Sequence, residues 1–303
     1  MPDEAVRAIV DRVLEVPDAH RVFGTPPNEA RRRYGVQAAL LDQLIGMGLP
    51  HRGRGDDLRC DALDLENVGM ALRLPSPQTT IVRQWARSLT GSRLRERGDY
   101  ELTIHWRCPE PGHAGECEFV LSEALASGTQ VVSQRDPAQG FVVLRAAPVD
   151  EEHEFDERSL AVLAAVAKLS FHRLPNALSE DLPFLRRTGL ADCQLACLHL
   201  LRTASELGVV ARPACGLFIG VLFPFPHSWV ELRVGGRWVP VDPFFLDTLG
   251  RWGVVDPEVW PRHRSPRNIL WRLRCALWLG EPLVAHHGLE APVSMSARWL
   301  PPG

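Results

Sequence analysis

Apolar side chains recur at helical spacing in the first part of the chain. Ile9, Val10, Val13 and Leu14 give one such face. The spacing predicts four helices, over residues 5–16, 30–34, 38–47 and 63–72. A tight turn at Gly35 separates the second helix from the third, Gly48 stops the third, and a glycine-rich basic loop precedes the fourth. This pattern predicts a helical module over residues 1–95.

Alternating apolar and polar positions follow, and they predict strands. These are expected over residues 99–106, 117–121, 129–133 and 140–146, arranged as two hairpins after a further helix candidate at 76–89. They define a small β-rich segment over 96–150. An acidic run at 151–157 is expected to be a surface linker, and a helix over 155–174 then leads into a last domain, 151–303.

Composition narrows the class of protein. The chain has 303 residues, 45% of them hydrophobic and 23% charged, which excludes disordered, collagen-like and coiled-coil proteins. A net charge of −3 gives no global attraction to nucleic acid or an anionic membrane. The N-terminus lacks a secretory pattern and no apolar stretch is long enough to span a membrane, so a cytoplasmic location with no membrane partner is expected. The seven cysteines are expected to be reduced thiols.

One cysteine stands where a helix is predicted to begin. Leucines at helical spacing follow Cys193, which places it in the first helical turn with Asp192 as the N-cap. Free backbone amides and the positive end of the helix dipole stabilise a thiolate at such a position. Most buried cysteines are inert, so the position alone does not establish chemistry.

A histidine and an aspartate are brought together by a predicted hairpin. Gly235-Gly236 lies between two alternating runs and predicts a two-residue β-turn. With that turn Trp229 faces Asp242, and His227 points to the same side of the sheet as Trp229. His227 and Asp242 are then diagonal neighbours within side-chain reach, which leaves the second imidazole nitrogen for a nucleophile. A slip of one residue in the register would separate them.

This region resembles the transglutaminase-like superfamily, whose core is a papain-like cysteine fold. The superfamily pattern is a cysteine at a helix start, Gly-x-x-x-Arg, His-x-Trp-x-Glu and Trp-x-x-x-Asp-Pro. It is carried here by Cys193, Gly208, Arg212, His227, Trp229, Glu231, Trp238, Asp242 and Pro243. The chain departs from the pattern at Ala191, where relatives often have glycine.

The resemblance implies roles and a reaction. Cys193 is the nucleophile, His227 the general base and then acid, and Asp242 the residue that orients His227, with the Cys193 backbone amide in the oxyanion site. Trp229, Asp192 and Arg212 are expected to support the site or contact substrate, and Arg212 to order the loop between helix and strand. The implied chemistry is cofactor-free acyl transfer through a thioester acyl-enzyme.

The resemblance implies two classes of partner but not a single biological function. They are an acyl donor, either a carrier-protein thioester or a peptide, and an amine acceptor, as in natural-product or peptide biosynthesis. The alternatives are a cysteine peptidase or amidase that cleaves a peptide precursor, and a DNA-binding regulator with a non-catalytic core. Aromatic residues 218, 223, 225, 229, 244 and 245 either wall an acceptor channel or, for at least half of them, belong to the core.

The N-terminal module resembles the winged helix-turn-helix of MerR regulators and phage excisionases. The matching pieces are Tyr34-Gly35-Val36, Gly48-Leu49-Pro50, the loop 51–57 and Asp64-Leu65. DNA binding would use arginines at 31–33, 52 and 54, whereas the other interpretation is a docking module with a solvated basic face. The fold class expected overall is α+β: this module, the β-rich segment and a papain-like transglutaminase core.

Some weaker signals concern metal. His105, Cys108, His113 and Cys117 are similar to a zinc knuckle, with one ligand type and one spacing different. The preferred interpretation is a hairpin with Cys108 and Cys117 near each other across it and no metal bound. His286-His287 lacks an evident third ligand, and Cys197 and His199 are expected to be core residues.

Overall fold

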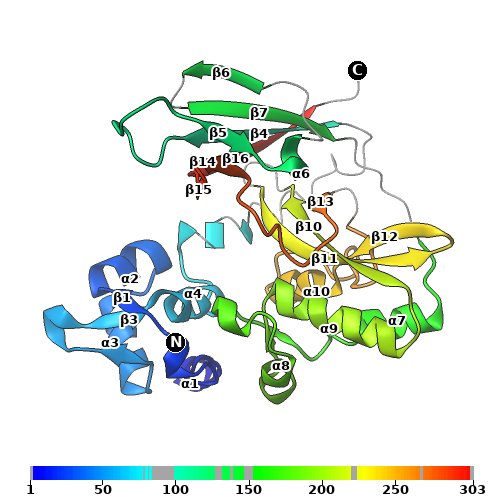
Figure 1. The fold of residues 1–303 in the computed structure, drawn as a ribbon. Coiled ribbons are helices and arrows are strands. Elements are labelled where there is room, and N and C mark those ends of the chain that lie inside the picture. The colour runs from blue at the N-terminus through cyan, green and yellow to red at the C-terminus, as the bar shows by residue number, and fades with distance from the viewer. Residues whose placement is uncertain are drawn as a thin grey trace. The chain divides into compact units, whose positions relative to one another are not determined.

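The computed structural model divides the chain into two compact units. It describes residues 3–77, 79–80, 82–83, 99–126, 132–136, 139–146, 153–219, 224–266 and 269–300. Unit 1 is Met1–Arg83 with Lys168–Ala196, and unit 2 is Gln84–Ala167 with Cys197–Gly303. Figure 1 labels the helices and strands of each unit. The units do not follow the predicted segments 1–95, 96–150 and 151–303, because each unit combines two separate stretches of chain.

Unit 1 opens with the helices that the apolar spacing predicts. Its elements are α1 (Asp3–Leu14), η1 (Asp18–His20), β1 (Phe23–Thr25), α2 (Pro27–Tyr34), α3 (Ala38–Gly46), β2 (His51–Arg52), η2 (Gly55–Asp57), β3 (Arg59–Asp61) and α4 (Ala62–Ala71). Gly35 ends α2 in the left-handed conformation, with φ of 73°, which glycine adopts without steric cost. The short strands form a sheet in the order β1-β3-β2. Two helices joined at Gly35 and then the β2–β3 hairpin over the glycine-rich stretch are thus present in the predicted order.

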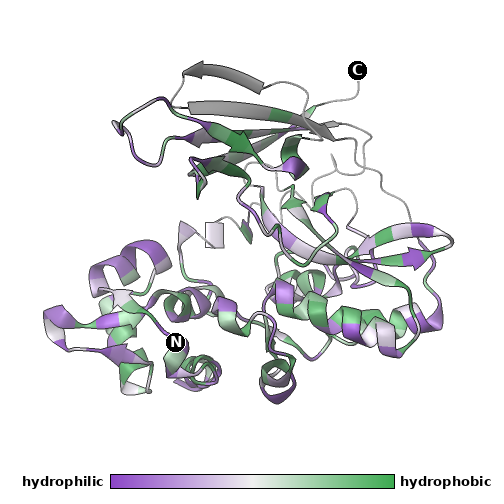
Figure 2. Ribbon diagram, viewed as in Figure 1, coloured by the Kyte–Doolittle hydropathy of each residue, from purple (hydrophilic) through white to green (hydrophobic). Residues whose placement is uncertain are grey.

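The first helix packs by its predicted apolar stripe. Val6, Ile9, Val10 and Val13 are buried in the core of unit 1. The prediction is wrong for Leu14, which is 48% exposed, because it lies at the end of α1 and off that stripe. In contrast, α2 is almost wholly hydrophilic (Figure 2).

The second stretch of unit 1 leads to the predicted nucleophile. It contains β8 (Ser170–Phe171), η4 (Asn176–Leu178), α8 (Leu182–Thr188) and β9 (Leu190–Ala191), and β8 pairs with β9 in parallel. The Asn67 side chain of α4 donates to the Arg173 carbonyl oxygen and accepts from the Arg173 amide, which joins the two stretches. The helix α9 (Cys193–Glu206) begins here, and the unit boundary falls within it.

Unit 2 contains the sheet that carries the predicted histidine and aspartate. Its order is β12-β11-β10-β13. The strands are β10 (Ala211–Phe218), β11 (Phe225–Val234), β12 (Arg237–Val241) and β13 (Leu270–Arg274), and all neighbours are antiparallel. The helix α10 (Pro243–Arg251) follows β12 directly, and its buried Phe245 packs on Phe218 of β10, with ring centroids 5.1 Å apart.

The remaining strands of unit 2 form two further sheets, ordered β16-β4-β7-β6 and β15-β14-β5. Their elements are β4 (Asp99–Arg107), β5 (Phe119–Leu121), α6 (Glu123–Ala126), β6 (Val132–Asp136), β7 (Gln139–Ala146), β14 (Val284–His286), β15 (Leu289–Glu290) and β16 (Val293–Leu300). The predicted hairpin of β6 and β7 is present. The predicted hairpin of residues 99–106 and 117–121 is wrong, because β4 pairs with β16 and β7 whereas β5 pairs with β14.

The sequence predicts two further helices, over 155–174 and 76–89. The helix expected over 155–174 is shorter: α7 (Glu157–Ala164) begins at its N-cap Asp156, and Ser170–Phe171 pairs with β9 instead. Most of the helix candidate 76–89 lies outside the described residues, as do residues 129–131. None of the described helices combines the length and apolar character that crossing a membrane requires.

Candidate functional site

The β11–β12 hairpin forms with the predicted register. Val234 pairs with Arg237, and the pairing continues outward to Val230 and Val241. Gly235 and Gly236 make the turn with φ of 54° and 79°, and positive φ at both positions is what a type I′ turn requires. The turn therefore fixes which residues of the two strands face each other.

The hairpin brings His227 to Asp242. Nε2 of His227 lies 2.5 Å from Oδ2 of Asp242, and both side chains are buried. The other carboxylate oxygen, Oδ1, accepts from the Phe245 amide at 3.1 Å and caps α10. One carboxylate thus ties the imidazole to a helix start, and Nε2 is the ring nitrogen engaged with the carboxylate.

Aromatic side chains surround the His227 ring. Phe245, Phe225 and Phe218 have ring centroids 5.0, 5.5 and 6.2 Å from it, and Trp229 stacks on it at 6.4 Å with an interplanar angle of 23°. These rings shield the His227–Asp242 pair from water, which strengthens its electrostatic interaction.

The aromatic residues predicted as channel walls or core are mostly core. Phe218, Trp229, Phe244 and Phe245 are buried, and Phe225 is half-buried. Residue 223 lies outside the described residues.

Glu231 and Arg212 brace the same sheet. They are register partners on β11 and β10, and Arg212 Nε donates to Glu231 Oε2 at 2.7 Å. Arg272 of β13 donates to the same oxygen at 2.6 Å, and the Arg212 guanidinium lies 4.1 Å from the Trp238 ring centroid. Arg212 lies in strand β10, and the Glu231 carboxylate joins three neighbouring strands by accepting from both arginines. That Arg212 orders the loop between helix and strand stays a prediction.

Cys193 lies at the start of α9 in unit 1. It is the first residue of the helix and is half-buried. Asp192 Oδ1 accepts from the Leu195 amide at 2.8 Å, as an N-cap does, and its Oδ2 accepts from the Ser179 hydroxyl at 2.7 Å. Burial raises the pKa of Asp192, and these two hydrogen bonds oppose that rise. The carboxylate next to the thiol is therefore engaged in capping.

The other thiols differ in setting. All seven cysteines lie in described residues, and none of them forms a disulfide. Cys197, one turn after Cys193, is buried and His199 is half-buried. Burial raises the pKa of Cys60 and of Cys215 to about 11, which makes both poor nucleophiles.

The structure divides the predicted triad between the two units. Cys193 belongs to unit 1, and His227 and Asp242 belong to unit 2. It brings His227 and Asp242 together, and the catalytic assignment of the three residues stays a prediction. A pocket of unit 2 lined by α10 and residues 257–263 contains none of them.

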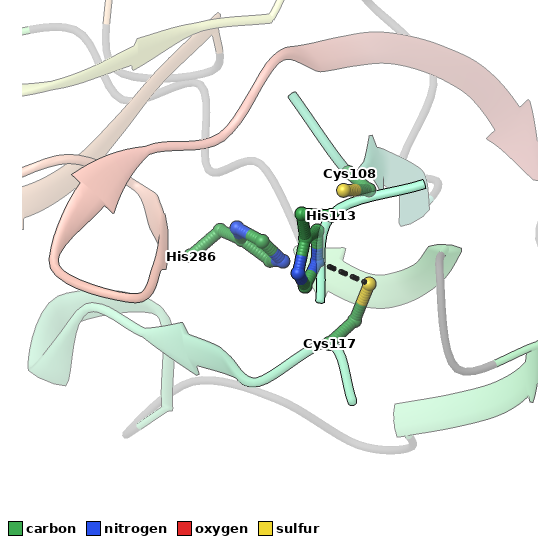
Figure 3. Close-up of side chains that lie close together, drawn as sticks. All are labelled: Cys108, His113, Cys117 and His286. Carbon is green, nitrogen blue, oxygen red and sulfur yellow. Dashed lines mark hydrogen bonds between the residues drawn. The ribbon is translucent and has the colours of Figure 1, made fainter. Parts of the chain in front are cut away.

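A second cluster gathers thiols and imidazoles in unit 2. The possible ligand atoms of Cys108, His113, Cys117 and His286 all lie within 4.8 Å of one another (Figure 3). Three of these residues are in the predicted zinc-knuckle pattern, but the fourth, His105, is not part of the cluster. Leu102, Ile104, Trp106 and Cys108 are buried along β4 and its end, and His105 alternates to the exposed face. His286 takes its place from the other end of the chain.

Comparison with known proteins gives little further identification. No protein-family model matches the chain, and no curated protein sequence matches it. One solved structure that is similar comes from Cytophaga hutchinsonii and is described as a "putative cysteine protease". It is 10% identical, with 69% of this chain and 92% of that chain covered and a TM-score of 0.36. A similarity at this level does not establish a common fold.

Proposed function

We propose that the chain is a transglutaminase-like cysteine enzyme in which Cys193, His227 and Asp242 act as nucleophile, base and orienting carboxylate. The observation that carries the proposal is the buried contact between His227 Nε2 and Asp242 Oδ2 at 2.5 Å. A buried carboxylate held on an imidazole is the arrangement that a general base needs. The half-buried thiol at the start of α9 supplies the third part, since a helix start stabilises a thiolate.

The proposed reaction runs through a thioester. His227 takes the proton of the Cys193 thiol on Nδ1, the nitrogen that does not bind Asp242, and the sulfur attacks the carbonyl carbon of the donor. The bond between that carbon and the leaving group then breaks, and the leaving group departs with the proton from Nδ1. An amine then attacks the thioester, His227 takes its proton, and Cys193 leaves as the thiolate. The first amides of a helix have no intrahelical acceptor, so the Cys193 amide suits the developing oxyanion. If water replaces the amine, the same site is a peptidase or amidase.

The proposed setting is a reducing compartment such as the cytoplasm, which seven cysteines without a disulfide favour. The proposed substrates are a carrier-protein thioester or a peptide as acyl donor and an amine as acceptor. No cofactor is required by this chemistry.

The test is alkylation followed by donor screening. Intact-protein mass spectrometry with iodoacetamide should show Cys193 labelled faster than the other six thiols, with the rate reduced in His227→Ala. Cys193→Ala should lose this label, whereas Cys275→Ser, which removes an exposed thiol, should keep it. Equal labelling of Cys193 and the other thiols would contradict the proposal. Thioester and peptide donors are then offered with and without amines: amine-dependent product indicates transfer, and product without amine indicates hydrolysis.

A second candidate function is DNA binding by the N-terminal module. The observation in its favour is that Arg31, Arg32 and Arg33 of α2 and Arg52 and Arg54 of the β2–β3 hairpin are all exposed. DNA retention should fall steeply with salt, survive Cys193→Ala and weaken when these arginines are replaced. Failure of the protein to be retained on DNA at low salt would contradict DNA binding and favour the interpretation of this module as a docking module.

A further inference from the structure

We propose that Cys108, His113, Cys117 and His286 bind a structural zinc ion within unit 2. Their donor set is two thiols and two imidazoles, which is a common set for structural zinc. Four protein donors fill a tetrahedral shell and leave no open position for a reacting water. The inference does not depend on the proposed function.

The spacing of the ligand atoms suits zinc after a small contraction. Zinc–sulfur and zinc–nitrogen bonds of about 2.3 and 2.0 Å in a tetrahedron place ligand atoms about 3.3–3.8 Å apart. Here all four lie within 4.8 Å of one another, and Nε2 of His113 is already 3.3 Å from Sγ of Cys117. The remaining adjustment in any one ligand–ligand distance is at most about 1.5 Å, which rotation of half-buried side chains can supply.

His286 has a buried nitrogen that lacks a partner. Among the described residues, its Nε2 is shielded from solvent and makes no hydrogen bond. An unsatisfied buried polar atom costs about 1–3 kcal/mol, so native proteins rarely retain one. The His286 ring packs on Phe119 at 4.8 Å and meets the His113 ring edge-on at 5.0 Å, so the nitrogen cannot simply turn to water. A metal ion at the centre of the cluster gives this nitrogen a partner.

The His113 ring is already held in the orientation of a ligand. Its Nδ1 lies 3.0 Å from the carbonyl oxygen of Ala114, which keeps a proton on Nδ1. Nε2 then carries the lone pair and faces the cluster. Metal-binding histidines usually donate their second nitrogen to a carbonyl or carboxylate in this way.

The loop that carries His113 and Cys117 buries few side chains that could hold it in place. In residues 109–118, Pro109, His113 and Cys117 are half-buried and the other residues are exposed. A loop that turns its cysteine and histidine inward while exposing the rest suits a metal-centred fold rather than an apolar core. Through Cys108 at the end of β4 and His286 at the end of β14, the ion would join the β16-β4-β7-β6 and β15-β14-β5 sheets.

The test is metal content and cobalt spectroscopy of the full chain. Protein produced with zinc in the medium should carry about one zinc per chain. Cys117→Ser and His286→Gln should each lower the zinc content at least about tenfold after dialysis against a mild chelator. His105→Gln, His287→Gln and Cys275→Ser are matched controls and should retain zinc. Cys193→Ala should also retain it, which separates this inference from the proposed enzyme activity.

Titration of metal-depleted wild-type protein with cobalt(II) chloride avoids any effect of substitution on folding. It should give the d–d absorption bands of a tetrahedral site with thiolate ligands. Absence of zinc together with absence of these bands would overturn the proposal. A disulfide between Cys108 and Cys117 found by mass spectrometry in freshly purified protein would also overturn it. Loss of zinc in His105→Gln but not in His286→Gln would overturn the ligand assignment.

Discussion

The Asp242 carboxylate binds both His227 and the start of helix α10: Oδ2 binds His227 Nε2, and Oδ1 accepts from the Phe245 amide. The helix start therefore holds the carboxylate, and the carboxylate holds the imidazole. Because both bonds are buried, a change at Asp242 affects the orientation of His227 and the stability of α10 together.

Replacing Asp242 by alanine should cost more than the loss of a helix cap. We expect the cap to contribute about 1 kcal/mol, and the unpaired buried His227 to add about 1–3 kcal/mol. Asp156→Ala is the matched control, because Asp156 caps α7 in the same unit through the Ser159 amide and binds no histidine. Urea unfolding measures both variants. Equal losses would show that the contact with His227 contributes nothing to stability.

Gly216→Ala should disturb the sheet at the partner of His227. Gly216 pairs with His227 across β10 and β11, and a Cβ at Gly216 would meet the Trp271 carbonyl oxygen at 2.0 Å. β13 must move away, so we expect a loss of about 1–3 kcal/mol and faster hydrogen exchange at β10 amides. Gly46→Ala is the control: nothing lies within 4 Å of its Cβ, and it should stabilise the protein by about 0.5–1 kcal/mol. Unchanged exchange in Gly216→Ala would contradict the close approach.

His172 should make unit 1 sensitive to acid. Burial lowers the pKa of His172 from 6.5 to about 4, with the charges of Arg12 and Arg21 adding to the shift. The unfolded chain binds a proton at His172 between these two pKa values and the folded chain does not, so the contribution of His172 to stability falls as pH decreases through this window. The loss from His172 is about 3 kcal/mol in total. Asp64, whose pKa burial raises to about 7, contributes with the opposite sign over the same window.

Hydrogen exchange of buried α4 amides between pH 4 and 7 measures this effect after correction for intrinsic rates. Compared with wild type, His172→Phe should lose less stability, by about 3 kcal/mol, between pH 7 and pH 4, because the Asp64 contribution is present in both proteins. His51→Gln, which changes an exposed histidine of the same unit, should match wild type. The same slope in His172→Phe as in wild type would assign the acid sensitivity to other groups.

The buried Arg21–Asp64 pair should show strong coupling. Nε of Arg21 lies 2.7 Å from Oδ2 of Asp64, and both side chains are almost fully buried. Burial raises the pKa of Asp64 to about 7 even with Arg21 beside it. Arg21→Met should cost about 3–5 kcal/mol because it leaves a buried carboxylate unpaired, and adding Asp64→Leu should restore much of the loss. The exposed Arg33–Glu29 pair should couple by less than about 1 kcal/mol. Additive losses at Arg21 and Asp64 would contradict the prediction.

Local sequence patterns predict much of unit 1 and one hairpin of unit 2. The helices α1 to α4 follow from apolar spacing and glycine stops, because a helix closes its hydrogen bonds within one stretch of chain. The contact of His227 with Asp242 follows from the two-glycine turn, which fixes a register that alternation then extends.

Pairing between distant strands was not predictable in this way. Strand β16 joins β4 and β14 joins β5 across about 160 to 200 residues of chain, so the segment 96–150 cannot complete its sheets alone. Of the four residues in the zinc-knuckle spacing, the structure gathers Cys108, His113 and Cys117 in one cluster and leaves His105 outside it. Spacing along the chain does not show that a strand turns His105 to the opposite face.

The sequence by itself determined the helices of the N-terminal module, the turn of the β11–β12 hairpin and the pairing of His227 with Asp242. Each of these depends on residues that are close together in the chain, at most about fifteen positions apart. Only the tertiary structure decided that Arg212 and Arg272 share Glu231, that the C-terminal strands complete the β-rich sheets, and that His286 joins Cys108, His113 and Cys117. The physical reason is that these contacts close long loops of chain. Burial and strand order select their partners, and neither is encoded in a local pattern.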